Sequence, residues 1–160
     1  MDNALINSFS QILERDLGKL DAEIDQYPSE KLLWKTAGEI INPPGNLSLH
    51  LCGNLQHYIG AQLGNSGYKR NRPLEFSVKN IPKDDLLLEI RRTKEAVTKA
   101  LKDLDDAALN KIYPEEVLGF PMTTGFFLIH LTAHFSYHLG QINYHRRLIG
   151  SCAVDVQSYH

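Results

Sequence analysis

The last third of the sequence carries a row of histidines whose spacing could hold a metal ion. His130, His134, His138, Gln141 and His145 are separated by four, four, three and four residues. An α-helix turns about 100° per residue, so these positions lie within an arc of about 80° on one face. Two histidines one turn apart can bind the same metal ion. The spacing predicts such a pair but does not choose between His130/His134 and His134/His138.

These histidines have no carboxylate beside them in the sequence. Between Val117 and Val154 there is no Asp or Glu. Partly buried imidazoles on this segment would therefore be neutral and hydrogen-bonded, as in an ordinary core, or would bind a cation. A metal would need a further ligand from elsewhere, and His50 and His57, seven residues apart, could present one from a second helix.

Four amphipathic helices are expected to position the histidines. Apolar residues recur at spacings of three and four over the approximate ranges 4–25, 46–63, 83–106 and 123–149. We expect Asn46 or Ser48 to cap the second helix and Gly150 to end the last. The alternation of Leu74, Phe76 and Val78 indicates one short extended piece with no partner strand. The sequence predicts an all-α fold, a four-helix bundle with long connecting loops, as a single domain over residues 1–160.

Composition and charge exclude several classes of protein. The 160 residues include 17 Lys+Arg and 19 Asp+Glu, a net charge of −2, without the basic surplus typical of nucleic-acid binding. No stretch approaches the ~18 apolar residues of a membrane span, and the start lacks the apolar region of a secretion signal. Cys52 and Cys152 cannot form a disulfide framework. We expect a cytoplasmic protein that acts on a small molecule, without a nucleic-acid or membrane partner.

Three segments carry a family resemblance. HLTAHFSYHLGQINYHRRLIG resembles the last helix of the DinB superfamily of metal-binding four-helix bundles, whose signature is a histidine pair followed by Gly-Gln. GNLSLHLCGNLQHYIG resembles its second helix, which supplies one further histidine. RNRPLEF resembles a segment that follows the second helix in an uncharacterised branch of the superfamily. The resemblance implies a DinB-like four-helix bundle.

The resemblance also implies a ligand set. The family's ligands fall on His50, His134 and His138, because the pair is the one directly before Gly140-Gln141. The implied cofactor is a divalent transition metal, zinc or nickel, with water completing its shell. Characterised relatives are thiol S-transferases and an isomerase that use a low-molecular-weight thiol. The family commonly has Arg where this chain has Leu139, which leaves the role of that arginine in doubt here. Three further histidines, His57, His130 and His145, would support the site or the fold.

Several neighbours of the implied ligands are candidates for the pocket. Asn54 and Gln141 each lie one turn from a ligand and could orient it or a substrate. Glu75 is the candidate proton acceptor, although a solvated loop charge is the commoner role for such a residue. Tyr137 borders the histidine face and could line the pocket. Cys52 lies on the opposite side of its helix from His50 and is expected in the core.

The function expected from these features is that of a metal-dependent enzyme. Three neutral histidines leave an open position on a metal, which could activate a thiol or a water. The sequence therefore favours a thiol S-transferase or a hydrolase, with no catalytic residue assigned. The alternative is a non-catalytic metal- or small-molecule-binding bundle. The apolar connector formed by Leu32, Leu33 and Trp34 should dock on the bundle and could also mediate a homodimer.

Overall fold

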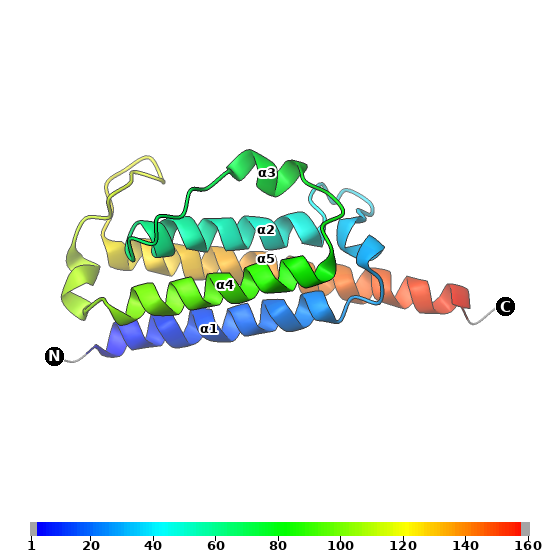
Figure 1. Ribbon diagram of the computed structural model, residues 1–160, viewed down its shortest axis with the longest axis horizontal. Helices are drawn as coiled ribbons and strands as arrows, with labels where there is room; N and C mark the ends of the chain where they lie inside the picture. The colour runs from blue at the N-terminus through cyan, green and yellow to red at the C-terminus, as the bar shows by residue number, and fades with distance from the viewer. Residues whose placement is uncertain (1–2, 158–160) are drawn as a thin grey trace.

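Four long helices form the predicted bundle. The computed structural model describes the backbone of residues 3–157 and the side chains of residues 3–150. The long helices are α1 (Ala4–Asp25), α2 (Pro44–Leu55), α4 (Lys83–Lys102) and α5 (Thr124–Gln157), with α2 continued by a π-helical turn, Gln56–Ala61. Figure 1 shows α1 and α5 running one way and α2 and α4 the other. The all-α prediction is confirmed: residues 3–157 contain no β-strand, only an isolated bridge between Ile112 and Thr123.

The first helix has the predicted bounds because its apolar spacing is regular. Its buried face packs against α4 and α5. The connector after it contains a short 3-10 helix, Glu30–Trp34, whose Leu33 is fully buried, so it docks on the bundle as predicted. A Cβ at Gly45 would lie 2.7 Å from the Trp34 ring, so this contact depends on glycine at the start of α2.

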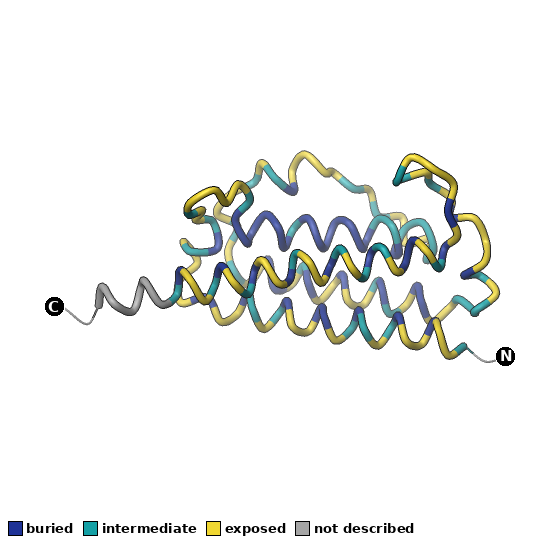
Figure 2. The backbone as a smooth tube through the Cα atoms, turned by 180° about the vertical axis from the view of Figure 1, so that it is seen from behind, coloured by how far each residue is buried: buried dark blue, intermediate teal, exposed yellow. Residues whose placement is uncertain are grey.

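Helix α2 packs against α3, α4 and α5 and is buried along nearly its whole length (Figure 2). It begins at Pro44, where a missing N–H is tolerated, and the prediction that Asn46 or Ser48 caps it is wrong. Both residues lie within α2, after its first turn has begun, and both are buried. The Asn46 amide donates 2.8 Å hydrogen bonds to the carbonyls of Glu75 and Val78. Asn46 therefore ties the segment after α2 onto the helix.

The expected extended piece at residues 74–78 is helical as far as Ser77, and only Val78 is extended. Helix α3 (Arg72–Ser77) lies over α2 (Figure 1), with the Asn71 side chain accepting a hydrogen bond from the Leu74 amide. Asn71 followed by Pro73 is a helix-start pattern, and it outweighs a three-residue alternation. This correction matters because α3 carries Glu75.

The ends of the last two long helices also differ from prediction. Helix α4 ends at Lys102, and Asp106–Asn110 forms a separate 3-10 helix whose first turn is capped by the Asp105 side chain. Helix α5 continues through Gly150, so the predicted C-cap is wrong. A glycine permits a helix end but does not impose one. The side chain of Cys152 lies outside the described residues. Within residues 3–157, every helix is too short or too polar to span a lipid bilayer.

His145 joins α5 to the connector between α1 and α2. It is buried, and both ring nitrogens have partners. Nε2 donates to the Lys35 carbonyl at 2.8 Å, so Nδ1 accepts the hydroxyl hydrogen of Tyr27 at 2.9 Å. Burial lowers the pKa of His145, and the bond to Lys35 only partly opposes this. This is the geometry of a neutral structural histidine.

Replacing His145 with alanine should lower the free energy of unfolding by about 1–3 kcal/mol, because Tyr27 and Lys35 lose a buried partner. The unfolded chain has the ordinary histidine pKa and the folded chain a lower one. The unfolded state therefore binds more protons as pH falls through the ordinary value, and stability is lost in that direction. Urea denaturation at about pH 8 and about pH 5 should show a larger loss on acidification in the wild type than in His145→Ala. Equal pH dependence in both proteins would contradict this role.

Candidate metal centre

The three histidines implied as ligands meet between α2 and α5. One ring nitrogen from each of His50, His134 and His138 lies within 4.8 Å of the other two. His50 Nε2 and His134 Nε2 are 3.2 Å apart, although the residues are 84 positions apart in sequence. The His134 and His138 rings lie edge to face with centroids 4.6 Å apart. Of the two pairs that the spacing left open, His134/His138 is the one that meets His50.

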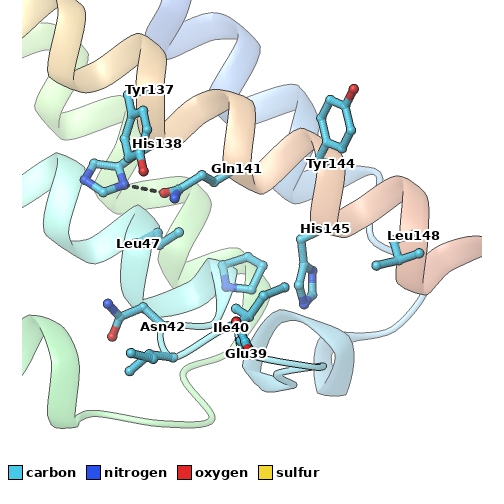
Figure 3. Close-up of a pocket in the computed structure, with 12 residues that line it drawn as sticks. Glu39, Ile40, Asn42, Leu47, Tyr137, His138, Gln141, Tyr144, His145 and Leu148 are labelled. Carbon is cyan, nitrogen blue, oxygen red and sulfur yellow. Dashed lines mark hydrogen bonds between the residues drawn. The ribbon is translucent and has the colours of Figure 1, made fainter.

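The outer nitrogens of two of these rings are held by other side chains. His50 Nδ1 donates to Glu75 Oε2 at 3.0 Å. His138 Nδ1 donates to the side-chain oxygen of Gln141 at 2.7 Å, as Figure 3 shows. A proton on Nδ1 leaves the Nε2 lone pair of each ring available to a metal ion. Gln141 therefore lies where it can orient His138.

Electrostatics keep the rings of His134 and His138 neutral. Burial, together with the neighbouring His138 and His50, lowers the pKa of His134 to about 4. Burial also lowers the pKa of His138, against the opposing hydrogen bond with Gln141. Metal-binding imidazoles must be unprotonated, so both side chains are in the binding form at neutral pH.

His134 differs from a satisfied core histidine. Its Nδ1 is buried without a hydrogen-bond partner, and its Nε2 faces a nitrogen of another imidazole. In His145, by contrast, both ring nitrogens have hydrogen-bond partners. Three nitrogen ligands around a tetrahedral zinc ion, at zinc–nitrogen distances of about 2.0–2.1 Å, lie roughly 3.3 Å from one another. The residues present therefore fit a divalent transition metal.

Glu75 reaches the centre from α3 and is buried, only 6% exposed. Its two oxygens accept hydrogen bonds from Arg70 Nε at 2.7 Å and Nη2 at 2.9 Å. Burial raises the pKa of Glu75, but the hydrogen bonds from His50 and Arg70 and the Arg70 charge outweigh it and leave the pKa below its usual value. The expectation of a solvated loop charge is wrong. An anionic carboxylate with both oxygens engaged is suited to orienting His50 rather than to accepting a proton.

The approach of Glu75 to α2 depends on Gly53. A Cβ at this position would lie 2.1 Å from Glu75 Oε1 and 2.9 Å from its carboxyl carbon. Gly53 lies three residues after His50, on the same side of α2. Any side chain at this position would therefore displace the carboxylate that holds the His50 ring.

Comparisons with known proteins agree with this fold. Residues 3–155 match the model of a family described as a protein of unknown function, DUF1572. The chain belongs to this family. A crystal structure of a DinB-like protein from Bacillus cereus is similar to the DUF1572 chain, with a TM-score of 0.72 and 18% identity, covering 90% of this chain and 92% of that one. The predicted DinB-like four-helix bundle is confirmed as a fold. The search among curated proteins found no match.

The other residues singled out in the DUF1572 sequence lie around the centre or apart from it. Asn54 is buried, and its side-chain oxygen has no hydrogen-bond partner. Tyr137 is exposed, with its ring centroid 5.2 Å from that of His138. His57 pairs instead with Glu115 at 2.8 Å. Cys52 is buried, which raises the pKa of its thiol to about 12, in agreement with a core position.

Two cavities of the DUF1572 protein are lined by different members of the group of three histidines. The larger, of about 710 Å³, includes His138 and Gln141 in its wall. The smaller, of about 340 Å³, is lined by His50, His134, Asn54, Arg70, Arg72 and His130, among others. A small molecule could therefore reach the centre through either cavity.

The sequence analysis did not identify Gly53, nor Arg70 as the residue that holds Glu75 beside His50. For Gly53, the sequence does contain an indication, because a glycine inside a helical pattern can mark a close approach of another group.

Proposed function

We propose that this DUF1572 protein is a metal-dependent enzyme in which His50, His134 and His138 hold a divalent transition metal ion, zinc or nickel. The observation that carries the proposal is the convergence of three ring nitrogens within 4.8 Å, with the outer nitrogens of His50 and His138 already bonded to Glu75 and Gln141. Sites with three neutral histidines and an open position are typical of catalytic rather than structural metal ions.

The reaction class that fits is attack by a thiol or a water on a small electrophile or ester. An ion held by three neutral imidazoles would lower the pKa of a coordinated water or thiol toward neutrality. A low-molecular-weight thiol is the proposed co-substrate of the transferase form of this reaction. Arg72, in the wall of the smaller cavity, offers a positive charge to an anionic group of such a molecule.

A proton released from the thiol or water needs an acceptor, and we propose His130 for this role. Glu75 is engaged by His50 and Arg70. His130 lines the smaller cavity together with His50 and His134, and its ring lies 6.2 Å from that of His134. It is outside the group of three that could hold the metal, and histidine is the commonest general base in enzymes.

Activity should require both the metal and His130. We expect zinc- or nickel-loaded protein to turn over activated esters, or electrophiles in the presence of cysteine or glutathione, and a chelator to abolish this turnover. His130→Gln should keep the metal but reduce kcat by about 10²-fold or more, the usual contribution of a general base. Activity that survives metal removal would contradict the proposal. Stoichiometric metal without turnover on any ester or thiol would favour the non-catalytic binding alternative.

A further inference from the structure

The larger cavity lies between α5 and the segment just before and at the start of α2. Figure 3 shows Tyr137, His138, Gln141, Tyr144 and Leu148 along α5 on one side, and Glu39, Ile40, Asn42 and Leu47 on the other. Its volume of about 710 Å³ falls in the range of small-molecule sites, about 300–1,000 Å³. The cavity is thus large enough for a ligand and is formed by two separate parts of the chain.

Large apolar side chains gather at its outer part although they are exposed to water. Ile41 is 86% exposed and Tyr144 is 74% exposed, and Ile40 and Leu148 are exposed beside them. Such a cluster around one concavity is a feature of ligand-binding sites. An alkyl chain or an aromatic ring would bury these surfaces on binding.

The charge of the wall distinguishes this cavity from the smaller one. All its lining residues belong to the described part of the chain, and they include Glu39 but no Lys or Arg. The smaller cavity instead has Arg70 and Arg72. An uncharged apolar group therefore fits the larger cavity better than an anionic group does. At its inner end, His138 and Gln141 are the residues next to the candidate metal centre.

From these observations we infer that the larger cavity binds the apolar part of the substrate, an alkyl chain or an aromatic ring, while the metal-binding end of the same molecule reaches His138. The inference rests on the proposed function, because it requires a metal at the three histidines. It adds the substrate class: an amphipathic small molecule with an uncharged apolar body.

Straight-chain hydroxamic acids test this directly, because the head group binds zinc and only the tail varies. Calorimetry on the zinc-loaded protein should show affinity rising from acetohydroxamic to octanohydroxamic acid by about two- to fourfold per methylene, as expected for burial of CH₂ groups. Ile41→Ser and Tyr144→Ser should each weaken octanohydroxamic acid by about fivefold or more and leave acetohydroxamic acid unchanged. Both side chains are exposed, so neither change should affect folding.

Ile129→Ser is the matched control, because Ile129 is also on α5, is 61% exposed and lines neither cavity. It should leave the whole series unchanged. Wild-type affinity that does not depend on tail length, in protein that holds zinc, would overturn this inference alone. Protein that binds neither zinc nor acetohydroxamic acid would overturn the proposed function with it. A wild-type dimer that Ile41→Ser converts to a monomer would show that a second copy covers the cavity and would also overturn the inference.

Discussion

Replacing His134 with alanine should abolish stoichiometric metal binding, whereas replacing His130 with alanine should leave it intact. His134 faces His50 across 3.2 Å and belongs to the group of three, while His130, one turn earlier on the same helix, does not. Loss of a direct ligand should weaken binding by more than the 10–100-fold typical of losing a residue that only orients a ligand. Elemental analysis after dialysis against limiting zinc gives the stoichiometry of each variant.

His130→Ala is a demanding control because it removes an imidazole from the same helix face and the same cavity wall. Equal loss of zinc from both variants would contradict the choice of the pair His134/His138 over His130/His134. Thermal unfolding of the zinc-free variants would show whether either loss has a cause in folding rather than in the site.

Replacing Glu75 with glutamine should weaken zinc binding by about 10–100-fold while the protein stays folded. The amide is similar in size, and its oxygen can still accept a hydrogen bond from Arg70. It lacks the negative charge that holds the proton on His50 Nδ1 and makes that ring a better ligand. Competition with a chromophoric zinc chelator measures the change in Kd.

Gly53→Ala should produce the same loss without altering any polar group. The new Cβ would lie 2.1 Å from Glu75 Oε1, so the carboxylate must shift from the position in which it bonds His50. Gly18→Ala is the matched control, because a Cβ there meets nothing within 4 Å. The control should gain up to about 1 kcal/mol of helix stability and keep its zinc affinity. Wild-type zinc affinity in both Glu75→Gln and Gly53→Ala would show that the carboxylate does not orient His50.

The parts of this structure that the sequence predicts well are those that depend on local periodicity. The 4–25 helix follows from its regular apolar spacing, and the shared face of His134 and His138 follows from the geometry of a single helix. The prediction of His50 as a ligand required the family resemblance, because no local pattern indicates which residue of α2 faces α5. Its position opposite His134 is a property of how the two helices pack.

The surroundings of the histidines could not be predicted because they depend on contacts between distant segments. From the sequence, Glu75 is expected to be a charged loop residue. In the structure, residues 72–77 form a helix on α2, and Asn46 holds this segment in place. His145 lies on the predicted histidine face, but Tyr27 and Lys35, more than a hundred positions away, make it a structural residue. Tertiary partners, not spacing, separate the structural histidine from the candidate ligands.

The most direct test of the central claim is a crystal structure of the zinc-loaded protein with anomalous diffraction measured at the zinc absorption edge. We predict one anomalous peak between α2 and α5, about 2.0–2.1 Å from a ring nitrogen of each of His50, His134 and His138. A peak bound by other residues, or no peak in protein crystallised with excess zinc, would contradict the assignment of these three histidines as the metal site.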